Sequence, residues 1–124
     1  MRRARHGFTL IELLVVLAII ATLFTLVAPR YFEHVERSRE TVLKHNLVAT
    51  RDAIDRYHAD RGTYPTSLQD LVTRRYLREV PLDPITGRND TWRTSPPPDG
   101  ASGIYQVHSG APGKGHDGTA FNTW

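Results

Sequence analysis

The sequence of 124 residues contains no cysteine, so no disulfide bond can stabilise its fold. It also lacks the residue patterns of common catalytic sites, because no nucleophile elbow, metal-protease helix or phosphate-binding loop is present. We therefore predict that the chain is not an enzyme and that it requires no cofactor.

An excess of positive charge is present but small, and it lies at the N-terminus. The chain has 16 Lys and Arg residues against 13 Asp and Glu, and Arg2, Arg3 and Arg5 account for the whole difference. The remaining basic residues are interleaved with acidic ones, and a neutral chain attracts nucleic-acid phosphates weakly. Nucleic-acid binding is therefore excluded as the main function.

A long apolar run follows these arginines. From Phe8 to Ala28 the only ionisable residue is Glu12. As a helix this run would be about 30 Å long, which is the thickness of the hydrocarbon core of a bilayer. A carboxylate one turn into such a helix is costly in lipid, needs a partner and indicates function. The pattern predicts a transmembrane or assembly helix over residues 8–29.

Two ordinary interpretations compete with a functional membrane helix. A secretory signal has its small-residue cleavage site after the apolar run, whereas Gly7 precedes this run and Pro29 follows Val27 and Ala28 at its end. A plain membrane anchor would tolerate Glu12 near the interface. The Gly7–Phe8 junction and Pro29 together favour a more specific role.

The hexapeptide Gly7–Glu12 resembles the processing and assembly signature of type IV pilins and type II secretion pseudopilins. The resemblance implies that prepilin peptidase removes residues 1–7 as a leader, cuts between Gly7 and Phe8, and N-methylates Phe8. The new ammonium group of one subunit would then pair with Glu12 of its neighbour. Buried charges cost far less when paired, and pairing at a single axial offset would set the register of helices in a filament.

Residues 30–61 are predicted to continue the same helix into a head of residues 30–124, which is long enough for one small domain. An apolar stripe at helical spacing is expected to pack on a sheet; it consists of Leu43, Leu47, Ala53, Ile54 and Tyr57. Pro29 lacks a backbone donor and is predicted to bend or loosen the helix. Gly62 is placed to end it.

The rest of the head is predicted to contain only short elements. Ser67–Asp70 resembles a capping box that opens a helix at about 67–77. From Pro81 to Gly118, 13 of 38 residues are Pro or Gly, which leaves room for short strands at 91–94 and 104–108. Trp92 and Trp124 are predicted to be core or lid residues. The fold class is therefore α+β, with a long N-terminal helix packed on a small antiparallel sheet.

The head is similar to the major, or G-type, pseudopilin of type II secretion. Three motifs occur in that subunit's order, namely Tyr64-Pro65, Tyr76-Leu77 and Pro81-Leu82-Asp83-Pro84. The resemblance implies a pseudopilus subunit that polymerises from the inner membrane, powered by a separate ATPase, to drive protein export across the outer membrane. Its implied partners are further copies of the chain, other pseudopilins, an inner-membrane assembly platform and prepilin peptidase. A minor pilin or competence-type pseudopilin of a type IV pilus machine is the alternative.

The resemblance also implies a single pass through the bacterial inner membrane, with a cytoplasmic N-terminus and a periplasmic C-terminal domain. The leader arginines favour this orientation, but four basic residues within 30–44 make the charge count ambiguous. The lack of cysteine weighs against the major pilins of type IV pili, which commonly carry a disulfide-closed loop. A membrane-tethered periplasmic enzyme is the alternative from a different functional class.

Residues 109–118, the C-terminal loop, occupy the place where G-type subunits bind a structural calcium ion. The resemblance implies Asp117 and the hydroxyl of Ser109 as ligands, together with backbone carbonyls. Calcium takes about six to eight oxygen ligands, yet Asp117 is the one carboxylate within residues 101–124, and Pro112 stands where the family has an aspartate. The alternative is a glycine-rich loop closed by hydrogen bonds of Asp117.

Overall fold

The computed structural model describes residues 7–124. The predicted leader lies outside the described residues except for Gly7. The elements are α1 (Leu10–Arg61), α2 (Leu68–Thr73), β1 (Arg93–Ser95), β2 (Gln106–His108) and the 3-10 helix η1 (Phe121–Thr123). The chain divides into two compact units, the first ending at Glu36 and the second running over Arg37–Trp124, and α1 contributes to both.

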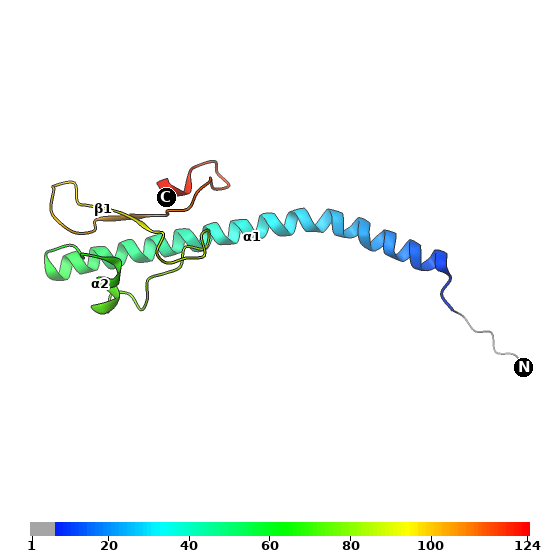
Figure 1. Cartoon of the computed structure of the whole chain (residues 1–124), viewed down its shortest axis with the longest axis horizontal. Helices are drawn as coiled ribbons and strands as arrows, with labels where there is room; N and C mark the ends of the chain where they lie inside the picture. Colours follow the sequence, from blue (N-terminus) through cyan, green and yellow to red (C-terminus); the bar gives the residue numbers. More distant parts are fainter. Residues whose placement is uncertain (1–6) are drawn as a thin grey trace, which may run out of the picture. The chain divides into compact units, whose positions relative to one another are not determined.

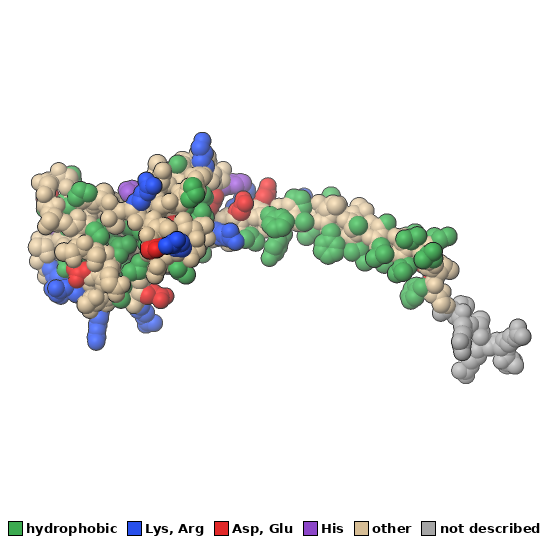
Figure 2. Space-filling view, in the orientation of Figure 1, with side chains coloured by type: hydrophobic (Ala, Val, Ile, Leu, Met, Phe, Trp, Pro, Cys, Tyr) green, Lys and Arg blue, Asp and Glu red, His purple; other side chains and the backbone are tan. Residues whose placement is uncertain are grey.

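The first unit contains the N-terminal part of α1, which is covered mainly by hydrophobic side chains (Figure 2). Among the described residues, α1 is the helix that is long and apolar enough to cross a membrane. The helix continues through Pro29 without interruption, as expected for residues 30–61. The bend at Pro29 stays a prediction. No residue of the most apolar stretch of α1 is buried within the chain, so its apolar surface has no intramolecular cover.

The second unit has its core along the C-terminal part of α1. The predicted stripe of Leu43, Leu47, Ala53, Ile54 and Tyr57 is buried, which confirms the helical spacing. Buried side chains from the other elements complete the core, namely Leu71, Ile104, Val107, Ala111 and Phe121. Figure 1 shows α2 and the two strands on different sides of this part of α1. At the end of α1, Gly62 has φ 71° and donates its N–H to the His58 carbonyl, as a helix-ending glycine should.

The two strands form an antiparallel sheet with Thr94 opposite Val107. They are shorter than the predicted 91–94 and 104–108 and begin two residues later, at Arg93 and Gln106. Val107 is fully buried, so one face of the ladder contributes to the core. Trp92 packs against the core as predicted, and its indole N–H donates to the Pro81 carbonyl at 2.8 Å. A long helix packed on a small antiparallel sheet confirms the α+β fold class.

The helix predicted at about 67–77 is shorter than expected, since α2 begins at Leu68 and ends at Thr73. Arg75 follows with φ 64°, a left-handed conformation that ends a helix. The Arg75 N–H bonds the Val72 carbonyl at 3.1 Å, and the Tyr76 N–H bonds the Leu71 carbonyl at 2.8 Å. These two bonds form a Schellman motif with arginine in the position that glycine usually occupies.

Candidate functional site

The segment that carries the predicted processing site ends in a capping box. The Glu12 backbone N–H donates to Thr9 Oγ1 at 3.2 Å, and the Thr9 backbone N–H donates to Glu12 Oε2 at 3.1 Å. These reciprocal bonds satisfy two backbone donors at the start of α1, where donors have no helical partner. A carboxylate in the first helical turn also interacts favourably with the helix dipole. The local sequence thus fixes where α1 begins and where the Glu12 carboxylate lies.

This capping box was missed by the sequence analysis, which assigned one only to Ser67–Asp70. The signal was present, because Thr9-Leu10-Ile11-Glu12 has the Thr-x-x-Glu spacing. The predicted cleavage site at Gly7 and Phe8 directly precedes this capping box, and the Phe8 side chain is 92% exposed. Within residues 7–124, the capping bond of Oε2 is the one contact found for the Glu12 carboxylate. No hydrogen bond to the second carboxylate oxygen is found within the same range.

The apolar part of α1 beyond Glu12 presents its side chains outward. Leu10 is 75% exposed and Ile20 is 43% exposed, and a shallow apolar groove is lined by Ile20, Leu23, Phe24 and Val27. Exposed apolar area of this extent marks a surface that contacts a membrane or other proteins. The Glu12 carboxylate and this surface belong to the same helix, with Glu12 in its first turn.

In the second unit, Asp70 joins α2 to α1. Its Oδ2 accepts from the Tyr57 hydroxyl at 2.9 Å, and its Oδ1 pairs with Arg74 Nε at 3.2 Å. The hydrogen bond from Tyr57, assisted by Arg74, lowers the pKa of the Asp70 carboxyl below its usual value. The same bond raises the pKa of Tyr57, mainly because it favours the protonated hydroxyl. The predicted capping box at α2 is half formed, because Ser67 Oγ accepts from the Asp70 N–H while the Asp70 carboxylate serves Tyr57.

Asp83 and Ser109 form a buried pair that the sequence analysis did not foresee. Both residues are fully buried, and Ser109 Oγ donates to Asp83 Oδ2 at 2.5 Å. The other carboxylate oxygen accepts from the Ile85 N–H at 2.8 Å, while Ser109 Oγ accepts from the Ala111 N–H at 3.1 Å. This pair ties the predicted turn around Pro84 to the start of the C-terminal loop. The Ser109 hydroxyl therefore bonds to a carboxylate in the core and does not face an ion site at the surface.

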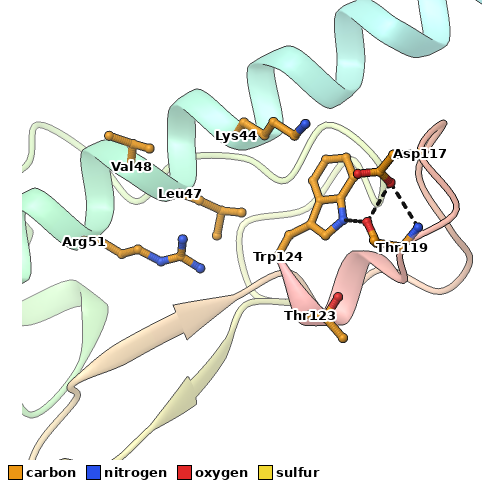
Figure 3. Close-up of a pocket in the computed structure, with 8 residues that line it drawn as sticks. All are labelled: Lys44, Leu47, Val48, Arg51, Asp117, Thr119, Thr123 and Trp124. Carbon is orange, nitrogen blue, oxygen red and sulfur yellow. Dashed lines mark hydrogen bonds between the residues drawn. The ribbon is translucent and has the colours of Figure 1, made fainter.

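Asp117, at the other end of the C-terminal loop, lies beside a pocket between α1 and the C-terminal residues (Figure 3). Its Oδ1 accepts from the Thr119 backbone N–H at 3.0 Å and from the Thr119 hydroxyl at 2.6 Å. These bonds, together with the positive charge of Lys44, lower the pKa of Asp117. The Thr119 hydroxyl in turn accepts from the indole N–H of Trp124 at 2.7 Å.

The two side chains predicted as calcium ligands do not fit a calcium site. Ser109 is buried against Asp83, whereas Asp117 is exposed and bonds to Thr119. No group of three acidic, histidine or cysteine residues that could hold a metal ion occurs within residues 7–124. Calcium needs about six to eight oxygen ligands with several carboxylates. One carboxylate and a hydroxyl that is already occupied fall short of that set.

Comparison with known proteins adds evidence along the chain. A family model described as the prokaryotic N-terminal methylation motif matches residues 2–28. Type II secretion system core protein G of Klebsiella michiganensis is 31% identical to this chain, over 94% of the chain and 92% of the relative. The proteins of the same name from Vibrio cholerae and Escherichia coli are 31% and 30% identical, over 94% and 87% of the chain and 88% and 82% of the relatives. No solved structure matches the chain at a significant level. The similarity thus extends from the N-terminal motif through the head.

Proposed function

This chain belongs to the family of type II secretion system core protein G, and we propose that it is a structural subunit of the secretion pseudopilus. The observation that carries the proposal is an uncovered apolar helix that begins with a single, locally positioned carboxylate at Glu12. Such a helix needs other apolar helices or lipid around it, which is the requirement of a subunit that is stored in a membrane and assembled into a filament. The type IV pilus alternative draws no support from the relatives named above.

Maturation is proposed to occur at the Gly7–Phe8 junction. Prepilin peptidase would remove residues 1–7 and methylate the new N-terminus at Phe8. The three leader arginines leave with the leader, so the mature chain carries equal numbers of basic and acidic residues. Arginines at the N-terminal side of an apolar helix favour a cytoplasmic N-terminus. We place residues 8–29 in the inner membrane and the second unit in the periplasm.

Assembly is proposed to use the second carboxylate oxygen of Glu12. The Thr9 N–H that caps Glu12 belongs to the Phe8–Thr9 peptide bond, which cleavage after Gly7 leaves intact. The capped carboxylate can therefore still accept from the ammonium group of Phe8 in a neighbouring subunit. Both charges are costly in hydrocarbon unless they are paired. Because the pair forms at one axial offset, it would fix how neighbouring helices align.

The role proposed here is mechanical and needs no catalytic group. The subunit would polymerise with its own copies and with other pseudopilins on an inner-membrane assembly platform, and a cytoplasmic ATPase would supply the energy. Growth of the filament would then move exported proteins across the outer membrane.

The test combines maturation with assembly. Mass spectrometry of the protein from cells is expected to show a chain that begins with methylated Phe8. The Glu12→Lys variant is expected to be cleaved normally but to lose filaments and secretion, because it places a cation opposite the Phe8 ammonium group. Glu33→Lys, an equivalent change at an exposed site beyond the apolar helix, is the control and should retain both. Normal secretion by Glu12→Lys, or an uncut leader in wild-type cells, would contradict the proposal.

A further inference from the structure

We propose that the C-terminal loop of this subunit is fastened to α1 by direct side-chain contacts in place of a calcium ion, and that the subunit folds and assembles independently of calcium. The starting observation is that Ser109 and Asp117 offer fewer oxygen ligands than the roughly six to eight that calcium takes. Apart from Asp117, the residues whose contacts hold the loop are ones that the calcium interpretation does not use.

The first fastening joins the loop to the beginning of the second unit. The His116 backbone N–H donates to Glu40 Oε1 at 2.7 Å, and the Arg37 guanidinium contacts His116 Nε2 at 2.8 Å. Arg37 and Glu40 lie three residues apart on α1, so they face the same side of the helix. A charged acceptor and a charged donor therefore hold one loop residue from both its backbone and its ring. Charge-assisted bonds of this kind are stronger than neutral ones.

The second fastening uses the Asp117 carboxylate, which a calcium ion would need as a ligand. Asp117 is bonded to Thr119, and Thr119 to the indole N–H of Trp124, as the dashed lines in Figure 3 show. The ammonium group of Lys44 on α1 lies 4.6 Å from the centre of the Trp124 ring. Lys44 also supplies positive charge near Asp117, which is the electrostatic role that a cation would have. A calcium ion would have to displace these hydrogen bonds, and Asp117 is the one side-chain carboxylate within residues 101–124 that could bind it.

Gly115 shows how closely the loop is packed on this arrangement. A Cβ at this position would lie 2.3 Å from Cζ2 of Trp124. The Gly115 N–H also donates to the Thr119 carbonyl at 2.8 Å, which closes the loop on itself. Trp124 stacks edge to face on Phe121, a core residue, at 5.0 Å between ring centres. The loop is thus connected to the core through an aromatic residue rather than through a metal.

Calcium binding can be measured on the full-length mature protein in detergent micelles. Calorimetric titration with calcium chloride should give no saturable binding, and the melting temperature should be the same with calcium and with EDTA. Saturable binding, or a melting temperature that falls in EDTA, would overturn the inference. Neither measurement depends on whether the protein forms filaments.

The fastening itself is tested by the Arg37→Ala/Glu40→Ala double variant. The matched control is Glu36→Ala/Arg39→Ala, which removes the same two residue types from the same stretch of α1. Loss of two contacts should speed hydrogen exchange at residues 113–119 roughly tenfold in the double variant, with little change in the control. Equal exchange in the two variants would show that Arg37 and Glu40 do not hold the loop.

The assembly part of the inference rests on the proposed function. Cells grown with a calcium chelator should still form filaments from the wild-type subunit, and the double variant should form fewer with or without calcium. Chelator-sensitive filaments made of a subunit that binds no calcium would place the ion elsewhere in the machinery and overturn calcium-independent assembly. If no filaments formed under any condition, the proposed function would fail, whereas the binding and exchange results would stand.

Discussion

Thr9 and Glu12 each use one side-chain oxygen to satisfy the backbone of the other, which gives the carboxylate a defined place before any neighbour arrives. A charge that must be paired inside hydrocarbon gains from such an arrangement, because less side-chain entropy is lost when the pair forms. The sequence could predict that Glu12 needs a partner, because it is the lone acid in an apolar run. The first partner, Thr9, lay in the same hexapeptide and was overlooked because the motif was interpreted as a processing signal.

Ser109 shows the limit of residue-level prediction more clearly. Its hydroxyl was a predicted ligand because it lies in the loop that resembles a calcium site. Its actual partner, Asp83, is 26 positions away in the sequence, and both side chains are buried. No periodicity or spacing connects two loop residues over such a distance. Pairings of this kind are decided by packing of the folded chain, which a local motif does not describe.

Tyr57→Phe tests the bond that joins α1 to α2. The change removes a hydrogen bond to a carboxylate, and we expect a loss of about 1.5 kcal/mol in the free energy of unfolding. Because the pKa of Asp70 is lowered in the folded state, the bond stabilises fully above the ordinary value of 3.8 and less as the pH falls below it. Because the pKa of Tyr57 is raised in the folded state, the stabilisation from this bond also declines as the pH rises above the ordinary tyrosine pKa of 10.0.

Denaturant unfolding across this pH range provides the measurement. The difference between wild type and Tyr57→Phe should be largest between the two values and should shrink toward both extremes. Tyr31→Phe is the control, because Tyr31 is an exposed tyrosine of the first unit. A difference that stays constant with pH would mean that the Asp70 carboxylate is not the partner that matters.

At the scale of elements, α1 was the most predictable part of the chain. Its apolar stripe keeps a helical period from Leu43 to Tyr57, and a long periodic segment leaves little choice of conformation. The short elements were placed less well. β1 and β2 begin two residues later than predicted, and α2 ends four residues before the predicted boundary at about 77. A strand of three residues or a helix of six is too short for a periodic pattern to define its ends.

The end of α2 gives the physical reason in one case. Arg75 occupies the left-handed position of a Schellman motif, where a side chain costs roughly 1–2 kcal/mol. An arginine in that position carries no sequence signal for a helix end, so a longer helix was predicted. Tyr76 directly follows this turn, and the centre of its ring lies 5.3 Å from that of Tyr57 on α1.

Arg75→Gly should therefore stabilise the protein. Glycine removes the left-handed penalty, while its extra freedom in the unfolded chain costs about 0.4–1 kcal/mol. We expect a net gain of about 0.5–1 kcal/mol in denaturant unfolding. The neighbouring change Arg74→Gly should destabilise, because φ of Arg74 is −95° and its guanidinium pairs with Asp70. A loss of stability in Arg75→Gly would mean that the arginine side chain contributes more than its backbone strain costs.

At the scale of the whole molecule, the two units differ in what stabilises them. Every buried hydrophobic residue of the described chain lies between Leu43 and Phe121, within the second unit. The first unit exposes its apolar side chains and contributes none of them to that core. Stability of the fold and the drive to assemble are thus assigned to different parts of one helix. This division follows from the sequence, since the apolar run from Phe8 to Ala28 ends before the amphipathic stripe begins at Leu43.

Removal of residues 1–29 should separate these two properties. The fragment 30–124 keeps the whole core, so we expect it to be folded, soluble without detergent and monomeric in analytical ultracentrifugation. Its melting temperature should be independent of protein concentration and within a few degrees of that of the full mature chain in detergent, which is the matched control. The full chain should aggregate when detergent is withdrawn, because its uncovered apolar helix then has neither lipid nor other subunits around it. An unfolded fragment would show that the apolar helix supports the head, and a fragment that still formed filaments would show that head contacts alone drive assembly.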